Sequence, residues 1–504
     1  MRTSSPMTLR RFAAGAVAGG LVLALSCRPE VSAIRQPRRA LDEVPRFEGT
    51  IALDKNLPPA RVVQHPHLAA NGRALMHVDA ASSDTYDISG PHGAHSTVHS
   101  ASLGLIGGEC STLNFDRQGR LIALCVKLSR PRLHMFAPDT LQQLAEYELP
   151  RRSTRSFELR RAMQDTSGGS YFFLDDRDRA VVGTSEGAIE IIAVQALGFE
   201  HVRSIDLHAQ LALRSPPDRI TAVMPDWDGR YWFTGRHGVV GVVTGEEVHA
   251  TVLPDEEIEN SFSVGPDGVY IVSDHALYRY QSGPDNSPVV VWRASYDRGT
   301  KRKIGQINQG SGTTPTLLGE SYVAIVDNAE PRENVLVYHR SDGRQICKTP
   351  VFAPGASATE NSLIGYQRSL IVENNAGYDL FTSMRGSRVS APGVARVDIR
   401  ANESGCDVVW TSAEISQTVV HKLSTVTGLV YLYTKLPHPE HDLEAFYLTG
   451  VDFESGATVF RSLVGTGMRF DNNWAELALG PSGAAYVGVL NGVVRIADVV
   501  TPEP

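Results

Sequence analysis

One short unit recurs along most of this 504-residue chain: an apolar strand, a tight turn that carries Asp, Gly or Pro, and a second, strongly apolar strand. Clear examples are NFDRQGRLIAL from Asn114, VMPDWDGRYWF from Val223 and SVGPDGVYIV from Ser263. Asp at the first and Gly at the fourth turn position is the chemistry of a type I turn, so the unit predicts a β-hairpin. Eight such hairpins begin near Ser111, Ser170, Ile220, Ser261, Pro315, Ser362, Lys422 and Trp474.

The spacing of these hairpins predicts the architecture. Their mean step is about 52 residues, which is the size of a four-stranded propeller blade. Each gap contains two further strand-like runs, such as ALYRYQ from Ala276 and PVVVWRAS from Pro288, and no helical periodicity of any length appears. We therefore predict an all-β fold in which residues 105–504 form a β-propeller of eight four-stranded blades, with seven as the alternative count.

Residues 46–104 are predicted to close this ring and to cover it. The last unit ends after GVVRIAD without an outer strand, and FEGTIAL from Phe47 is expected to supply one, which would also remove a free sheet edge. The remainder is rich in Gly, Ser and His without strand periodicity and is expected to fold over one face as a cap. Six histidines lie within 35 residues, and either loop histidines or a transition-metal site near Asp79 would explain them: His65, His67, His77, His92, His95 and His99.

The N-terminus predicts export. Arg2, Arg10 and Arg11 precede an apolar stretch that is too short to span a bilayer, so residues 1–26 are predicted to be a signal peptide. The residues before Cys27 resemble a bacterial lipobox, which implies lipidation of Cys27 and attachment to a membrane. Residues 27–45 are polar and contain three prolines, as expected for a tether. The expected location is extracytoplasmic, either as a membrane-anchored lipoprotein or in a secreted or periplasmic form.

Charge and cysteine content bear on the partner and on the compartment. The formal net charge of −8 and the absence of a Lys/Arg stripe do not favour nucleic acid as a partner. Four cysteines besides Cys27 form an even set for an oxidising compartment. Cys110 and Cys125 flank the turn at residues 116–119. A two-residue loop would place them opposite one another, whereas a one-residue bulge at Gly119 would forbid the disulfide.

Two tryptophans carry a resemblance to known propellers. The strands ending VVVWRAS at Trp292 and DVVWTSA at Trp410, with the turn GVDFESGATVF from Gly450, resemble the repeats of quinoprotein-like propellers, in which a strand tryptophan docks neighbouring blades. The stretches from Gly310 to Tyr338 and from Ser357 to Tyr378 look like an uncharacterised family of exported bacterial β-propeller proteins. These resemblances imply a fold and no activity.

The candidate site lies on the face opposite the hairpin turns. Asn and carboxylate side chains gather there at first-strand starts and second-strand ends, and ENS occurs at residues 259–261 and again at 360–362. With two-residue loops, Glu259 is expected opposite Asp274 and Glu360 opposite Glu373. Like charges so placed repel, unless a hard cation, a raised pKa or a cationic neighbour relieves them.

We therefore predict a polar channel mouth that holds Ca²⁺. The predicted calcium ligands are Glu259, Asn260, Glu360, Asn361 and Glu373. The predicted ligand-binding residues are Asn260, Asn361, Asp327, Asn328 and Asn374. An alternative remains that these groups only cap strand ends, bond to loop backbone and face water.

Two functions follow from these patterns. The first is an envelope module that binds a small ligand or a protein, which the absence of any catalytic motif favours. The second is a metal-dependent hydrolase or lactonase with Glu360 or Glu373 as general base, because propellers similar to the paraoxonase and gluconolactonase families hold calcium at such a mouth. Whether the chain is an enzyme stays open at this point.

The lipid anchor has a direct test. Cys27→Ser removes the thiol that would carry the lipid, so the variant is expected to leave the membrane fraction and appear in the soluble extract. Fractionation followed by immunoblotting of parent and variant measures this, and an unchanged distribution would contradict lipidation at Cys27.

Overall fold

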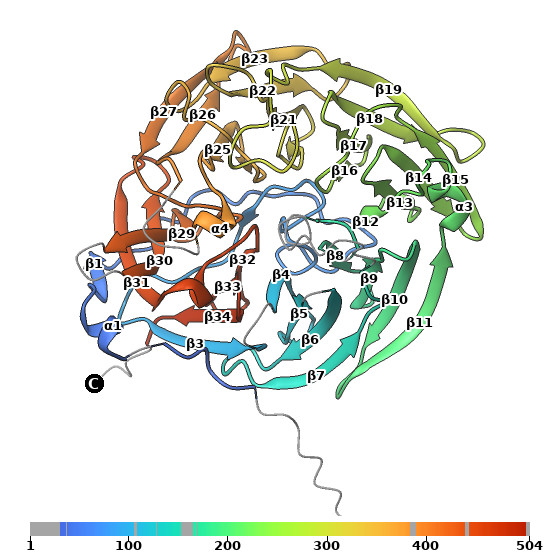
Figure 1. The fold of residues 1–504 in the computed structure, drawn as a ribbon. Helices are drawn as coiled ribbons and strands as arrows, with labels where there is room; N and C mark the ends of the chain where they lie inside the picture. Colours follow the sequence, from blue (N-terminus) through green and yellow to red (C-terminus); the bar gives the residue numbers. More distant parts are fainter. Residues whose placement is uncertain are drawn as a thin grey trace, which may run out of the picture.

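The computed structural model describes residues 31–36, 38–104, 108–127, 129–152, 165–168, 170–383, 390–438 and 443–499. Within them the chain forms eight antiparallel sheets arranged in a ring (Figure 1). This confirms an all-β propeller of eight four-stranded blades. The signal peptide and Cys27 lie outside the described residues.

The first four blades follow one another along the chain, each running from the channel to the rim. Blade 1 contains β4 (Glu109–Phe115), β5 (Leu121–Lys127), β6 (Arg130–Phe136) and β7 (Gln143–Glu148). Blade 2 contains β8 (Phe172–Leu174), β9 (Arg179–Gly183), β10 (Ala188–Val194) and β11 (Phe199–Asp206). Blade 3 contains β12 (Ile220–Pro225), β13 (Tyr231–Gly235), β14 (Val239–Thr244) and β15 (Glu247–Val252). Blade 4 contains β16 (Ser263–Gly265), β17 (Gly268–Val272), β18 (Ala276–Ser282) and β19 (Pro288–Ser295).

The remaining blades complete the ring. Blade 5 contains β20 (Thr316–Leu318), β21 (Tyr322–Val326), β22 (Asn334–His339) and β23 (Gln345–Pro350). Blade 6 contains β24 (Ile364–Tyr366), β25 (Ser369–Glu373), β26 (Val394–Ile399) and β27 (Cys406–Ser412). Blade 7 contains β28 (Lys422–Ser424), β29 (Leu429–His438), β30 (Leu443–Asp452) and β31 (Thr458–Thr466). Blade 8 contains β32 (Leu477–Leu479), β33 (Ala485–Val489), β34 (Gly492–Ala497) and an N-terminal strand.

The helices of the described residues are short. They are α1 (Arg38–Asp42), α3 (His208–Leu211), α4 (Leu380–Ser383) and the 3₁₀ turn η2 (Met468–Phe470). A search of the described residues for a helix long and apolar enough to cross a membrane found none.

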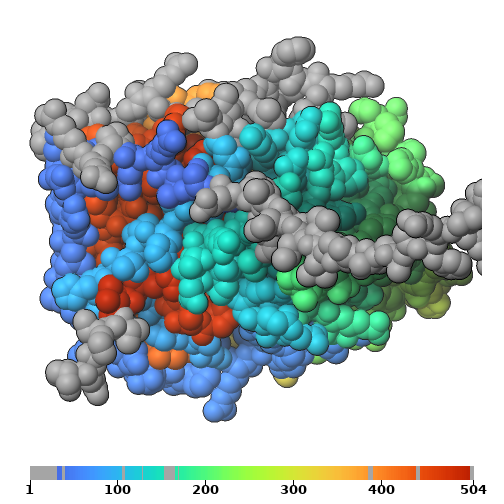
Figure 2. Space-filling view, turned by 90° about the horizontal axis from the view of Figure 1, so that it is seen from below, coloured from blue at the N-terminus to red at the C-terminus, as the bar shows by residue number. Residues whose placement is uncertain are grey.

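The ring is closed by a different N-terminal strand from the one predicted. β3 (Thr97–Ser102) pairs antiparallel with β34 and forms the outer strand of blade 8. β1 (Phe47–Gly49), at the start of FEGTIAL, pairs instead with β31 and widens blade 7 at its rim. Only a short connection separates Ser102 from Glu109, the first residue of blade 1, so a chain that has paired with β34 enters blade 1 directly. In Figure 2 the blue N-terminal residues cover the rim beside the red C-terminal blades.

The predicted tether packs against the propeller over its described part. From residue 31 onward, apolar side chains interrupt the polar stretch, and Ile34, Ala40 and Val44 are buried. The Ser102 amide donates to the Ser32 carbonyl oxygen (2.8 Å), and the Tyr447 hydroxyl donates to that of Pro45 (3.0 Å). These contacts hold the segment against the rim.

The segment predicted to be a cap enters the central channel instead. The innermost strand of each blade has one edge that no neighbouring strand pairs, and buried backbone groups need partners. Carbonyl oxygens between residues 73 and 86 accept hydrogen bonds from innermost-strand amides of six blades. The donor and acceptor residues are Phe115 to Arg73, Leu174 to Ala74, Val264 to Ala80, Leu317 to Ala81, Gly365 to Ser83, Leu423 to Asp84 and Thr425 to Tyr86. β2 (Thr85–Tyr86) thereby pairs in parallel with β28.

A buried polar cluster holds this channel segment at its centre. Asp84 accepts hydrogen bonds from the Lys422 ammonium (2.6 Å) and the Ser362 hydroxyl (2.6 Å), and its Oδ2 lies 3.1 Å from His77 Nδ1. All four side chains are buried. Burial alone would raise the pKa of Asp84, but the charge of Lys422 and the contact with His77 lower it to about 2. The segment is therefore anchored by an ion pair as well as by its backbone.

Three contacts at the rim join blades 4 to 7. Trp292 of blade 4 lies against Gly343 in a turn of blade 5 and donates from Nε1 to the Arg340 carbonyl oxygen (2.8 Å). Trp410 of blade 6 repeats this against Gly456 of blade 7, with Nε1 donating to the Phe453 carbonyl oxygen (2.9 Å). Between them, a disulfide joins Cys347 of blade 5 to Cys406 of blade 6.

The second disulfide, between Cys110 and Cys125, forms despite a bulge at the turn. Gly119 adopts a φ of 76° in a three-residue loop, closed by the Asp116 amide donating to the Arg120 carbonyl oxygen (3.1 Å). Without a second irregularity, this loop would leave Cys110 one residue out of line with Cys125 on the neighbouring strand. A second bulge at Ser111 shifts the pairing back by one residue, so Cys110 faces Cys125.

The disulfide between blades 5 and 6 is expected to contribute substantially to stability. Cys347→Ala with Cys406→Ala opens a loop of 59 residues and should lower the free energy of unfolding by about 2–4 kcal/mol, because the unfolded chain gains conformational entropy. Denaturant unfolding of parent and double variant in non-reducing buffer measures the loss. The matched pair Cys110→Ala with Cys125→Ala opens only 15 residues and should cost less, and the reverse order would contradict this account.

Candidate ligand pocket

The predicted pair of Glu259 and Asp274 does not form. β16 and β17 are joined by a two-residue loop as expected, but Asp274 pairs with Glu257 through both backbone and carboxylate (2.9 and 2.7 Å). Glu259 forms an ion pair with Arg236 instead. A cationic neighbour thus compensates the buried carboxylate.

The predicted pair of Glu360 and Glu373 is also absent. The two-residue loop between β24 and β25 brings Asn375 level with Glu360, whose amide donates to Asn375 Oδ1 (2.6 Å). Glu373 accepts hydrogen bonds from the side-chain amides of Asn361 (2.7 Å) and Asn375 (2.9 Å), and its other oxygen lies 3.3 Å from His421 Nδ1. Amides and an imidazole, rather than a second carboxylate, therefore surround Glu373.

The other predicted ligand-binding side chains are also buried and hydrogen-bonded within the protein. Asp327 accepts from the Asn334 amide (2.7 Å), and Asn260 Oδ1 accepts from the Tyr171 hydroxyl (3.4 Å). Asn328 donates to the carbonyl oxygens of Arg298 and Lys301, and Asn374 to those of Ala356 and Pro392. Most of these side chains hold loops against strand ends.

Glu360 is the exception at this face. Its side chain is buried, and neither carboxylate oxygen makes a side-chain hydrogen bond of good geometry. Burial raises its pKa to about 8, although the backbone of Ile307 and the charge of Arg236 oppose the rise. Within the described residues no three His, Cys, Asp or Glu side chains converge as metal ligands do. The Ca²⁺ site, which also relied on asparagine oxygens, stays a prediction.

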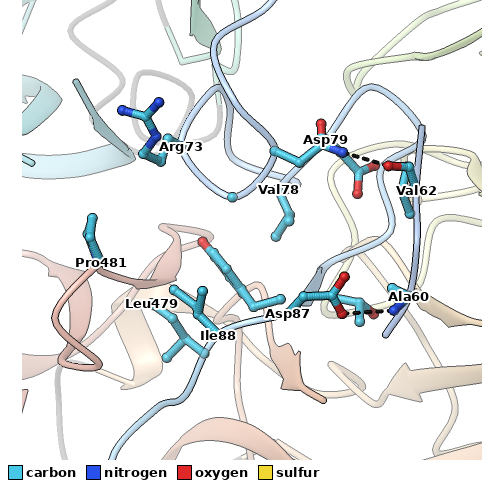
Figure 3. A pocket seen from close by; sticks show the side chains of 13 residues that line it. Ala60, Val62, Arg73, Val78, Asp79, Asp87, Ile88, Leu479 and Pro481 are labelled. Carbon is cyan, nitrogen blue, oxygen red and sulfur yellow. Dashed lines mark hydrogen bonds between the residues drawn. The ribbon is translucent and has the colours of Figure 1, made fainter. Parts of the chain in front are cut away.

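A cavity lies at the opposite, turn end of the channel, where the sequence predicted only ordinary turn residues. It has a volume of about 240 Å³, and Figure 3 shows the side chains around it. Most of its walls belong to the channel segment and the loop before it, and blade 8 supplies the rest. The lining residues are Ala60, Val62, Asn71, Gly72, Arg73, Val78, Asp79, Thr85, Tyr86, Asp87, Ile88, Leu479 and Pro481.

Backbone hydrogen bonds shape this pocket. The Gly72 amide donates to the Val78 carbonyl oxygen (2.7 Å) and closes the loop that carries Arg73. An added Cβ at Gly72 would lie 3.2 Å from the Tyr86 ring, so the φ of 83° and the missing side chain let this loop approach the ring. Asn71 Nδ2 donates to the Val62 carbonyl oxygen (2.9 Å) and ties the opposite wall to the same loop.

The acidic residues of the pocket are engaged by the protein. Asp79 accepts from the Ala81 amide (2.9 Å) and from the Ser83 hydroxyl (2.5 Å), and burial raises its pKa to about 7. Asp87 is exposed, and its Oδ1 accepts from the Ala60 amide (2.8 Å) and the Thr425 hydroxyl (2.9 Å). Arg73 is partly buried, and its guanidinium has no hydrogen bond or ion pair to any described residue.

The six histidines predicted as a cluster are dispersed. His65 and His67 lie near the turn of blade 3, His77 lies in the channel, and His99 sits on β3. His92 bonds to Asp54 (2.7 Å). Loop and channel contacts thus account for the described histidines, and they do not converge on one metal site.

Sequence reasoning missed a repeated clasp on the turn face. In blades 1, 2 and 3 an aspartate accepts hydrogen bonds from turn amides and from an arginine four residues later. The pairs are Asp116 with Arg120, Asp175 with Arg179 and Asp226 with Arg230. The signal was present as D-x-x-x-R in three hairpins. These clasps neutralise arginines around the channel on this face.

Comparisons with known proteins add little beyond the fold. No family model matches the chain. An uncharacterized protein from Archaeoglobus fulgidus is 26% identical over 320 residues, which are 56% of this chain and 61% of that protein. The chain therefore spans about three fifths of that relative's length.

Solved structures are similar at low identity. BamB from Moraxella catarrhalis is 13% identical, with a TM-score of 0.39, and the match covers 63% of this chain and 93% of that one. A catalytically inactive virginiamycin B lyase from Staphylococcus aureus with quinupristin is 10% identical, with a TM-score of 0.42, and the match covers 80% and 100%. Our assignment of eight blades rests on the sheet topology itself.

Buried carboxyls predict that stability falls as pH rises. Burial raises the pKa of four glutamates to about 8 and that of Asp79 to about 7; the glutamates are Glu109, Glu333, Glu360 and Glu476. The native state then holds protons that the unfolded chain has released, so the stability present below pH 4.5 is lost progressively up to about pH 8.

Glu360→Gln tests this for one carboxyl. Compared with the parent, the variant should gain about 1–3 kcal/mol in free energy of unfolding between pH 5.5 and 8.5, because glutamine has no charge to bury. Chemical denaturation at both pH values measures the gain. The exposed control Glu320→Gln should show none, and an equal response of both variants would contradict the prediction.

Proposed function

We propose that this protein is an exported binding module whose propeller holds a small organic molecule in the pocket at the turn end of its channel. The observation that carries the proposal is the cavity of about 240 Å³ with largely apolar walls and a few polar side chains. Burying an apolar ligand against such walls favours binding, while the polar groups orient the ligand. The volume is slightly below that of pockets for drug-sized ligands, which favours a compact molecule.

Rigidity supports this proposal. The pocket walls continue directly into the channel segment, whose backbone is hydrogen-bonded to six blades. A wall held in this way loses little conformational freedom when a ligand enters, so less binding free energy is spent on ordering the site. The propeller acts as the support for a preformed pocket.

Export is part of the proposal. Two disulfides, Cys110–Cys125 and Cys347–Cys406, support an oxidising compartment. Together with the signal sequence and lipid attachment predicted at Cys27, they favour a binding module held at the outer surface of a membrane. A polypeptide partner on another face would be compatible with the same location.

The hydrolase alternative is less well supported. It requires Glu360 or Glu373 to reach a substrate and a metal ion. Both side chains are buried, and Glu373 Oε1 is occupied by Asn361 and Asn375. The binding function therefore agrees better with the observed contacts.

The proposal is tested by ligand-observed NMR with benzyl alcohol as a probe of the pocket. Val62 lines the cavity and is partly exposed, so Val62→Trp should fill it and abolish the saturation-transfer signal seen with the parent. Val63→Trp is the matched control, because Val63 is 60% exposed and does not line the cavity. Equal signals from both variants would contradict binding in this pocket.

A further inference from the structure

We infer that the ligand of this pocket is a small organic acid, whose anionic group binds Arg73 and whose apolar body lies against the channel wall. This inference rests on the proposed function and adds the chemical class of the ligand. Its starting point is the single cationic side chain among the lining residues.

Arg73 differs from the arginines around it because its guanidinium has no partner among the described residues. Arg120, Arg179 and Arg230 on the same face are clasped by aspartates, and Arg117 pairs with Asp178 (2.8 Å). The backbone at Arg73 is nevertheless fixed, since its amide donates to the Ala70 carbonyl oxygen (3.0 Å) and its own carbonyl oxygen accepts from Phe115 (3.2 Å).

The Arg73 guanidinium lines the pocket and bonds to none of the described residues, so it is free to bind a carboxylate. Its planar fork can donate two parallel hydrogen bonds to the two oxygens of one carboxylate, and bonds between ionised groups are about twice as strong as neutral ones. Partial burial also limits the screening of such a pair by solvent. A carboxylate would therefore bind more tightly here than at an exposed arginine.

The acidic side chains set the orientation of the ligand. Figure 3 shows Arg73 and Asp87 on opposite sides of the cavity. The carboxyl of Asp79 is turned into the residue 79–83 turn, where it accepts from Ala81 and Ser83. An anionic group is repelled by Asp87 and attracted by Arg73, so both charges place it at the Arg73 end.

The body of the ligand is then directed to the apolar walls. Val78 lies between Arg73 and Asp87, and Ile88, Leu479 and Pro481 line the neighbouring side of the cavity (Figure 3). Removing apolar surface from water contributes roughly 25 cal/mol per Å², so a ring or a short alkyl chain is the favoured body. An inorganic anion would leave these walls uncovered.

Three probes of one shape and different charge test the inference on the full chain: benzoate, benzyl alcohol and benzylamine. Dissociation constants are measured by NMR titration at pH 7.5 and constant ionic strength. Benzoate should bind about tenfold more tightly than benzyl alcohol, a difference of about 1.4 kcal/mol. Benzylamine should bind more weakly than either, because its cation is repelled by Arg73.

Arg73→Gln should remove the preference for benzoate without changing the affinity for benzyl alcohol. Its thermal midpoint should match that of the parent, because the Arg73 side chain makes no bonds to the described protein. Arg177→Gln is the matched control: Arg177 is exposed in the turn of blade 2 and does not line the cavity. This variant should keep the full preference.

The outcomes separate the two claims. If benzyl alcohol binds in a Val62-dependent manner but benzoate has no advantage, or keeps its advantage in Arg73→Gln, the inference is wrong and the pocket stands. If none of the three probes binds in a way that Val62→Trp removes, the proposed function fails and the inference fails with it.

Discussion

The hydrogen bonds between the channel segment and the innermost strands organise this molecule. A propeller blade leaves its first strand with one unpaired edge that faces the channel. Here, carbonyl oxygens between Arg73 and Tyr86 accept from amides of six blades, which satisfies groups that would otherwise need water. Because one short segment contacts blades that are distant in sequence, it links the two ends of the ring through its centre. The buried ion pair of Asp84 and Lys422 adds a second, directional connection.

The rim is joined by a different set of interactions. Trp292 and Trp410 each reach from an outer strand to a glycine turn of the next blade, and the Cys347–Cys406 disulfide occupies the interval between them. β1 and β3 cover the outer edges of blades 7 and 8. The N-terminal region thus contributes to the structure three times, at the rim, in the channel and at the pocket. The pocket depends on this arrangement, since its walls are a continuation of the segment that fills the channel.

Carboxylates and asparagines at strand ends were predicted to bind a cation, because the sequence places them on one face of the propeller. In the structure most of them hold loops or pair with cations, as Glu259 does with Arg236. The two-residue loop between β24 and β25 places Asn375, and not Glu373, opposite Glu360. Asp274 pairs with Glu257, two residues away from Glu259. Arg73 carries no sequence signal at all, because what distinguishes it is that its guanidinium bonds to no described residue.

The sequence by itself determined the hairpins and the propeller, and it predicted eight blades with seven as the alternative, a count that the sheet topology settles. Those features depend on local alternation and turn chemistry, which repeat about every 50 residues and can be recognised from the sequence alone. It also predicted that an N-terminal strand closes the ring, but not that the strand is Thr97–Ser102. That choice, the Cys110–Cys125 pairing and the course of the channel segment were decided by tertiary structure. The closing strand and the channel segment depend on which distant backbone groups the blades leave without partners, and the disulfide depends on the bulge at Ser111. A linear pattern does not contain that information. The pocket lies between the channel segment, the loop before it and blade 8, so its shape also depends on those tertiary contacts.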